Sequence, residues 1–353
     1  MRRISLYSLY LFLFLSASCE QATIPETTPD DNDPTVEVLR ITSVSLKGNT
    51  SVRSIITGTE TDPVSGTNTN GKISRLGMYA VCTDGTEYQP ANGKNTATYV
   101  NAATGKWQPA ANLTGDESLR LCSTPVYIHA WHPASLLPSY SNGNFYVTGI
   151  GLLTADDFQA TGQTDYLYAA GSSGNGGTAG TKTAVTSQNN PGLSFTMKHA
   201  LAKLTFKMKK DLSIDASETL TLKQIVLKSY GNNFLTGSGS NRRMSLQDGV
   251  LSGLVATEKL TYTGDLVLNH TTQDVVALVA PIKDMQRFSF ELTVSSANGE
   301  TRKYQTKALN VSTTWEAGKN YAYTIKADKM SAILEGLPEV TDWTDEKNDI
   351  PIQ

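Results

Sequence analysis

The chain has 353 residues, with 30 Lys and Arg against 33 Asp and Glu, so its formal net charge at pH 7 is −3. Charged residues make up 18% of the chain, and only 3 Cys and 4 His are present. A slightly acidic chain offers no overall basic field for nucleic acid. So few Cys and His argue against a disulfide-stapled mini-protein and against a large His/Cys metal cluster. A chain of this length usually forms about two domains.

Residues 1–18 have the pattern of a secretory signal peptide. Arg2 and Arg3 precede an apolar run from Leu6 to Leu15, and small residues follow that run. An apolar run of about 10 residues is too short to span a bilayer as a helix. Cys19 stands directly after the small residues and looks like the cysteine of a bacterial lipobox, so we expect cleavage before it and acylation of its thiol. The alternative is a Cys that merely follows an ordinary signal peptide.

The next segment, residues 19–35, is rich in Pro and acidic residues and contains one large apolar residue, Ile24. Such a composition cannot bury enough apolar surface to order itself. It predicts a flexible tether between the lipidated Cys19 and the folded part of the chain.

From Val36 onward, apolar and polar residues alternate with the period of two that is typical of half-buried strands. The alternation is clearest over 200–209, 288–295 and 320–327. Further strands are expected over 36–46, 73–82, 119–131, 144–150, 220–229 and 275–282. No segment sustains an amphipathic helical repeat over three turns. Many short strands separated by Gly, Asn and Asp turns predict an all-β fold built from sandwiches.

A Gly- and Ser-rich stretch, Gly171 to Thr181, is followed by Asn189, Asn190 and Pro191. This composition is typical of a loop or a domain boundary. We therefore predict an N-terminal β-sandwich domain over 36–192 and a C-terminal one over 193–353.

No catalytic or metal-binding motif stands out. The sequence HAWH at 129–132 falls in a predicted strand and lacks the HExxH pattern, so His129 and His132 are interpreted as core or edge residues. His199 and His270 fall in separate strand or turn contexts, and nothing in the sequence places a nucleophile against either ring, so a Ser/His/Asp triad has no support. We expect no enzymatic activity, no cofactor and no metal.

Five aromatic residues raise the question of sugar binding, because flat rings stack on sugar faces. They are Trp107, Trp131, Tyr140, Tyr146 and Tyr166. Aromatic residues in sandwiches more often fill the core. A surface-anchored glycan-binding lipoprotein that does not polymerise is nevertheless the alternative functional hypothesis.

Two cysteines remain if Cys19 is acylated. Export permits a disulfide between Cys82 and Cys122, provided that their Cα atoms come within about 7 Å. The alternative is a pair of buried free thiols.

Four motifs follow one another along the chain. Residues 199–207 are HALAKLTFK, residues 315–325 are WEAGKNYAYTI, and residues 340–343 are VTDW. Upstream, Arg53 and Ser54 precede the sequence ISRLGMY at 73–79. In this order and spacing, behind a lipobox, the motifs resemble those of the fimbrillin family, the type V pilins of Bacteroidetes surfaces.

The resemblance implies an all-β fold of two transthyretin-like β-sandwich domains in tandem. It also implies an outer-membrane lipoprotein precursor that an arginine-specific protease trims before strand exchange with other pilin subunits builds a cell-surface fimbria. Adhesion to a host protein or glycan would be the fimbria's role. Applied to this chain, the cut falls between Arg53 and Ser54 and removes the strand within 36–53. Arg40 is the competing cut, although it lies inside the strand pattern.

The strand donated to a neighbouring subunit should lie at a terminus and have free apolar side chains. The segment 331–353 offers Ile333, Leu334, Leu337, Val340, Trp343, Ile350 and Ile352. The alternative is that this segment folds back as the last strand of its own domain.

Overall fold

The computed structural model describes residues 37–46, 73–90, 93–101, 106–110, 118–141, 143–152, 163–173, 182–190, 192–231, 233–309, 313–328 and 331–343. Across these ranges the chain forms strands, turns and coil, which confirms the predicted all-β class. Over the same ranges there is no helix with the length and apolar character needed to cross a membrane. Cys19, Arg53, Ser54, Ile350 and Ile352 lie outside the described residues.

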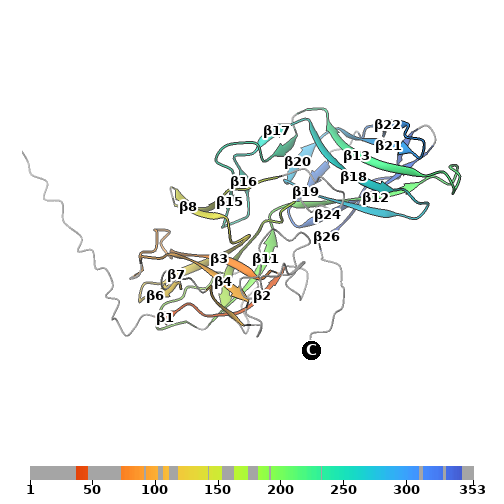
Figure 1. The fold of residues 1–353 in the computed structure, drawn as a ribbon. Coiled ribbons are helices and arrows are strands. Elements are labelled where there is room, and N and C mark those ends of the chain that lie inside the picture. Colours follow the sequence, from red (N-terminus) through yellow and green to blue (C-terminus); the bar gives the residue numbers. More distant parts are fainter. Residues whose placement is uncertain are drawn as a thin grey trace, which may run out of the picture.

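The first half of the chain forms a seven-stranded sheet, seen in the lower part of Figure 1. In spatial order its strands are β2 (Ile41–Leu46), β11 (Leu193–His199), β10 (Leu167–Ser173), β7 (Val126–His132), β3 (Arg75–Cys82), β4 (Thr96–Asn101) and β5 (Trp107–Pro109). The pair β2 and β11 is parallel, and the other neighbours are antiparallel. A short strand, β1 (Glu37–Val38), pairs with β6 (Arg120–Leu121).

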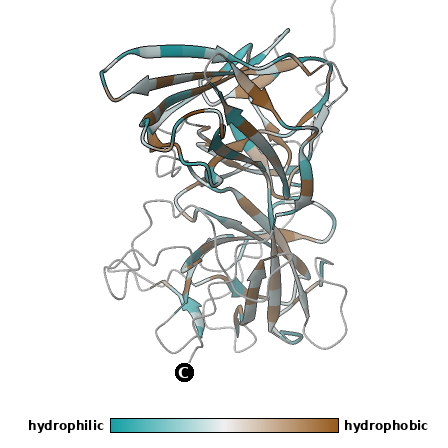
Figure 2. Cartoon of the chain, turned by 90° about the vertical axis from the view of Figure 1, so that its right-hand side faces the viewer, coloured by the Kyte–Doolittle hydropathy of each residue, from teal (hydrophilic) through white to brown (hydrophobic). Residues whose placement is uncertain are grey.

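Two sheets from the second half enclose another core. One contains β19 (Gln273–Val279), β12 (Ala202–Lys210), β24 (Lys319–Ala327) and β25 (Ala332–Leu334), with β26 (Glu339–Asp342) also on β24. The other contains β18 (Lys259–Val267), β13 (Leu220–Ser229), β21 (Phe288–Ser296) and β22 (Thr301–Gln305). Phe206 of the first sheet meets Phe290 of the second edge to face, with 5.6 Å between ring centroids. Hydrophobic and hydrophilic bands alternate along the strands, as period-two patterning requires (Figure 2).

A smaller sheet joins the two halves of the chain. It contains β8 (Leu137–Ser141) and β9 (Asn144–Thr148) from the first half, and β15 (Arg243–Ser245) and β16 (Leu251–Ser252) from the second. A third cluster of buried residues lies with it and takes side chains from both halves, including Trp131, Tyr166 and Trp343. Two further pairs complete the strands: β14 (Phe234–Thr236) with β17 (Val255–Thr257), and β20 (Ile282–Met285) with β23 (Thr313–Trp315).

Several predicted boundaries need correction. The predicted strand 119–131 divides into β6 and β7, and 275–282 divides into β19 and β20 around Pro281, which has no N–H to donate to a ladder. The predicted boundary near residue 192 falls too early, because β11 follows it and lies in the seven-stranded sheet. The change of sheet comes between His199 and Ala202. A Gly-rich composition marks a loop, and it does not say which sheet the next strand joins.

Candidate functional site at the terminal segments

The N-terminal described segment, 37–46, lies at the edge of the seven-stranded sheet. Leu39, Val44 and Leu46 are buried in its core, at 2%, 6% and 2% exposure. β2 is held along β11 in parallel register, with Val44 opposite Phe195. A groove of about 610 Å³ lies between this segment and β5. Removal of the segment would therefore expose the edge of β11 and leave the space of three apolar side chains unfilled.

Arg40 lies between β1 and β2, and its backbone is held on both sides. Its N–H donates to Asn190 Oδ1 at 3.4 Å, and its carbonyl accepts from the N–H of Leu193 at 2.9 Å. Asn190 Nδ2 donates to the carbonyl of Val38 at 2.9 Å. Because a protease needs an accessible, unpaired backbone, a cut at Arg40 requires this segment to open first. Cleavage at Arg53 and acylation of Cys19 stay predictions.

The C-terminal described segment, 331–343, folds back on its own sheet. β25 and β26 both pair antiparallel with β24, with Leu334 opposite Ile325 and Val340 opposite Tyr321. This is the arrangement of the alternative that the sequence left open. Its use as a donor stays a prediction.

The apolar side chains of this segment differ widely in their exposure to solvent. Trp343 is 1% exposed, whereas Ile333, Leu337 and Val340 are 39%, 68% and 52% exposed. Leu334 is half-buried. Three of the candidate donor side chains thus remain largely in contact with solvent when the segment lies on its own subunit.

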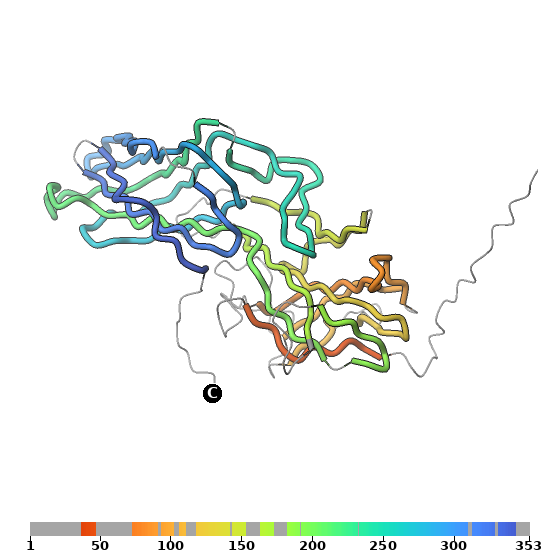
Figure 3. The backbone as a smooth tube through the Cα atoms, turned by 180° about the vertical axis from the view of Figure 1, so that it is seen from behind, coloured from red at the N-terminus to blue at the C-terminus, as the bar shows by residue number. Residues whose placement is uncertain are grey.

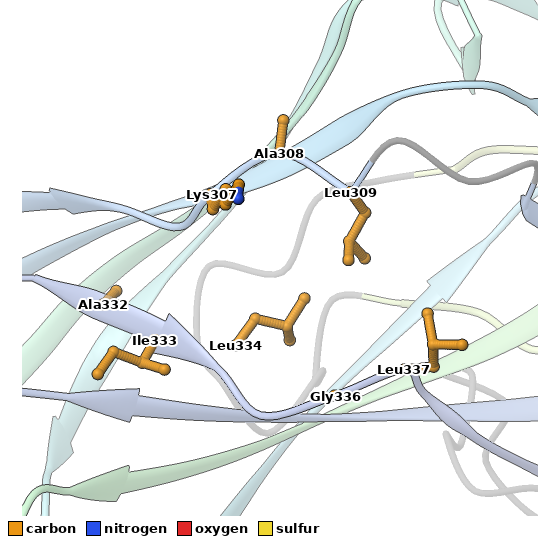
Figure 4. Close-up of a pocket in the computed structure, with 8 residues that line it drawn as sticks. All are labelled: Lys307, Ala308, Leu309, Ala332, Ile333, Leu334, Gly336 and Leu337. Carbon is orange, nitrogen blue, oxygen red and sulfur yellow. The ribbon is translucent and has the colours of Figure 1, made fainter.

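An apolar groove of about 500 Å³ runs beside β25 (Figure 4). Its lining residues are Lys307, Ala308, Leu309, Ala332, Ile333, Leu334, Gly336 and Leu337. In this view Leu309 and Leu334 point into the space between the segment 307–309 and β25 (Figure 4). The groove therefore opens alongside a sheet edge that already exposes apolar side chains.

At the other end of the segment, a pocket of about 160 Å³ lies beside Trp343, which lines it together with Tyr168, Lys198, His199, Ala317 and Gly318. We call the position of the Trp343 side chain among these residues the Trp343 slot. The indole lies parallel to the His199 imidazole, and the backbone N–H of Trp343 donates to the carbonyl of Gly318 at 2.9 Å. The end of the described chain thus lies against β11 (Figure 3).

His199 is itself held by a buried carboxylate. Its Nδ1 lies 3.0 and 3.1 Å from the two carboxylate oxygens of Asp165. The two side chains are 2% and 0% exposed. The carboxylate can accept only from a protonated Nδ1, so it orients the ring and fixes the face on which Trp343 stacks.

Three of the motifs found in the sequence meet at this slot. HALAKLTFK provides His199, WEAGKNYAYTI provides Gly318 and Lys319, and VTDW provides Asp342 and Trp343. Lys319 and Asp342 form a salt bridge at 2.6 Å, and this hydrogen bond raises the pKa of Lys319. Sequence reasoning listed the motifs without bringing them together and missed Asp165. A lone Asp gives no signal of its partner.

The other sequence candidates do not form a site. Cys82 and Cys122 are free thiols, which is the second of the two alternatives that the sequence left open. The Tyr88 hydroxyl donates to Cys122 Sγ at 3.3 Å, and burial raises the pKa of Cys82. Among the described residues, no group of three or more His, Cys, Asp or Glu is placed to hold a metal ion.

The five aromatic residues considered for sugar binding form no continuous exposed platform. Trp131 and Tyr166 are buried, and Arg243 covers the Tyr146 ring at 4.1 Å. Trp107 packs against the first core, and Tyr140 is 38% exposed. His129 and His132 are buried beside the carbonyls of Leu246 and Arg75. Trp131, Tyr166, His129 and His132 thus have the core positions that the sequence favoured, whereas Tyr140 does not.

The fold thus defines a class: an all-β protein whose described terminal strands lie on sheet edges. A family model described as fimbrillin-like matches residues 61–343, so the chain belongs to the fimbrillin-like family. This confirms the resemblance that the four motifs indicated.

Solved structures share the fold. One protein of Bacteroides ovatus, provisionally assigned to cell adhesion, is 14% identical with a TM-score of 0.54, over 88% of this chain and 100% of that one. A similarly assigned protein of Bacteroides uniformis is 18% identical with a TM-score of 0.53 and the same coverage. A fimbrial protein of Bacteroides vulgatus is 10% identical with a TM-score of 0.53, over 76% of this chain and 93% of that one. No curated protein sequence matches the chain.

Proposed function

We propose that this chain is a structural, non-enzymatic subunit of a cell-surface fimbria that assembles by strand exchange after its N-terminal segment is removed. The observation that supports this most directly is the position of residues 37–46. They contain β1 and the edge strand β2, and Leu39, Val44 and Leu46 are buried in the first core. Loss of such a strand creates an acceptor for a strand from another subunit.

Burial of new apolar side chains in the space left by the removed segment is energetically favourable. Each buried aliphatic side chain contributes roughly 1.5–3 kcal/mol, so three contribute about 5–9 kcal/mol before entropic costs. A donated strand with similarly spaced apolar side chains would recover that burial and pair with β11. A head-to-tail contact that does not close into a ring gives an open filament.

The donor we propose is the C-terminal segment, 331–353. Ile333, Leu337 and Val340 are already exposed on it. At about 3.3 Å per residue, the segment extended could reach roughly 70 Å. It is therefore long enough to cross onto a neighbouring subunit.

The N-terminal sequence supports the route to the surface. The signal pattern and Cys19 fit export as a lipoprotein to the outer membrane, before trimming after Arg53 frees the subunit for the fimbria. Adhesion to a host protein or glycan is the role we assign to the assembled fimbria.

The test compares residues 20–353 with residues 54–353 by size-exclusion chromatography with light scattering. We expect the longer protein to be monomeric and the shorter one to form oligomers that heat in SDS dissociates. Monomeric behaviour of both would contradict strand exchange.

Processing is tested separately in cells that export the full chain. Arg53→Ala should abolish trimming, whereas Arg40→Ala should leave it unchanged because the Arg40 backbone is held by hydrogen bonds. Normal trimming of Arg53→Ala would move the cut to another residue.

A further inference from the structure

We propose that Trp343 is the catch that keeps the C-terminal segment on its own subunit, and that withdrawal of Trp343 from its slot controls when the segment becomes available to a neighbour. This inference rests on the proposed function, since it concerns the same segment. Release of the segment is thereby controlled by the Trp343 side chain and by the Asp165–His199 pair on which it stacks.

The strand before Trp343 is weakly attached. All 4 residues of β26 are exposed, although its backbone pairs with β24. Its ion pairs, Lys207 with Glu339 at 3.2 Å and Lys319 with Asp342 at 2.6 Å, lie at the surface. Surface ion pairs contribute little to stability. Side-chain burial at this end of the segment is therefore concentrated in Trp343.

The slot is built to hold an indole. The Asp165 carboxylate orients His199, the imidazole stacks on Trp343, and the Gly318 carbonyl accepts from the Trp343 backbone. Gly318 is fixed in turn, because its own N–H donates to the carbonyl of Leu201 at 2.8 Å. His199 and Gly318, the two residues that contact Trp343 here, are therefore each held in place by a hydrogen bond to a third residue.

The docked state has a defect that favours exchange. Trp343 Nε1 and His199 Nε2 are buried and have no hydrogen-bond partner. A buried polar atom without a partner destabilises the state that contains it. Withdrawal of the indole lets water reach both nitrogens. The docked state of the segment is therefore stabilised by Trp343 but remains reversible.

A turn between β25 and β26 allows β26 and Trp343 to move together without β25. Residues 335–338 separate β25 from β26, and Gly336 has a φ of +79°. The Glu335 N–H donates to the carbonyl of Thr324 and ends the β25 ladder. The apolar groove beside Leu334 and Leu337 lies at this turn (Figure 4). Once Trp343 leaves, β26 can therefore detach while β25 remains paired.

The first experiment measures release in the untrimmed monomer, residues 20–353, by hydrogen exchange. His199→Ala weakens the slot and leaves the donor sequence intact. We expect exchange at 339–343 to rise by roughly tenfold or more, with exchange at 332–334 unchanged. His270→Ala, a histidine bonded to the Ile214 carbonyl outside the slot, is the control. Unchanged exchange at 339–343 in His199→Ala would overturn the proposal.

The second experiment fixes the segment reversibly and does not depend on tolerance of the first variant. Lys319 and Asp342 stand opposite each other, next to the hydrogen-bonded pair of Gly318 and Trp343. They form the closer, non-hydrogen-bonded kind of pair, which suits a disulfide. In trimmed Lys319→Cys/Asp342→Cys, oxidation should slow oligomer formation by roughly tenfold or more, and reduction should restore it. The oxidised and reduced trimmed wild type is the control.

Undiminished assembly of the oxidised variant would overturn the proposal while leaving strand exchange intact. If the trimmed wild type does not assemble, the proposed function fails. The exchange measurement on the untrimmed monomer then still decides whether Trp343 is the catch.

Discussion

The indole of Trp343 lies flat on the imidazole of His199, with 3.7 Å between ring centroids and 9° between ring planes. The contact joins the end of the C-terminal segment to the end of β11, which belongs to the seven-stranded sheet. The Asp165 carboxylate orients this imidazole through a hydrogen bond to His199 Nδ1. One stack therefore connects the predicted donor segment to the sheet that receives β2.

Asp165→Ala should lower the free energy of unfolding by about 3 kcal/mol, because removal of one partner leaves a buried His199 Nδ1 without its acceptor. Urea denaturation measures the change. Asp265→Ala is the matched control, since Asp265 is 73% exposed and pairs with Lys223 at the surface. We expect its effect to stay below ~1 kcal/mol. Equal losses in the two variants would contradict a buried-pair role for Asp165.

Stability should fall as the pH drops from about 6.5 toward 4, because of His129. Burial, followed by the nearby charge of Lys182, lowers the pKa of His129 to about 4. The unfolded chain binds this proton near pH 6.5, so between those values it carries more protons than the folded chain. The stabilisation is complete above pH 6.5 and is lost on acidification, by about 3 kcal/mol at pH 4.

His129→Gln removes this titration. Urea denaturation across that pH range should give the variant a flatter stability profile than wild type. Parallel profiles for the two proteins would exclude His129 as the source of the pH dependence.

Gly77→Ala should destabilise the seven-stranded sheet by about 2–3 kcal/mol. Gly77 lies opposite Trp131 across β3 and β7, and a Cβ on it would come 2.0 Å from Trp131 Cε2. Thermal unfolding followed by circular dichroism tests this. Gly151→Ala, whose Cβ would meet its nearest atoms at 3.8 Å, should change stability by less than ~0.5 kcal/mol. A tolerated Gly77→Ala would mean that Trp131 moves aside freely.

Lys210→Met should cost about 2 kcal/mol, because it removes the donor to three carbonyls in one loop. Lys210 Nζ lies 3.0, 3.3 and 2.8 Å from the carbonyl oxygens of Asp215, Ala216 and Glu218, and the residue is 5% exposed. Lys207→Met on the same strand, which loses only a surface ion pair, is the control. Urea denaturation and hydrogen exchange over 211–218 measure the loss. Unaltered hydrogen exchange over 211–218 in Lys210→Met would show that the loop keeps its conformation without the Lys210 hydrogen bonds.

The strands themselves were predictable because burial of one face imposes a period of two. The patterns at 220–229, 288–295 and 320–327 correspond closely to β13, β21 and β24. The four motifs indicated the family, which the match over 61–343 confirms. Local alternation and short motifs are properties of neighbouring residues, so the sequence alone contains them.

The partners of the edge strands could not be predicted, because alternation does not identify which strand lies beside another. Only the tertiary structure pairs β2 with β11 in parallel and places β11 in the first sheet, beyond the Gly-rich loop that suggested a boundary. It also brings Asp165 and His199 to Trp343. The sequence by itself determined an all-β member of the fimbrillin-like family with candidate strands at both ends. Only long-range packing decided that the indole that follows the last described strand, β26, is buried against His199 of the first sheet.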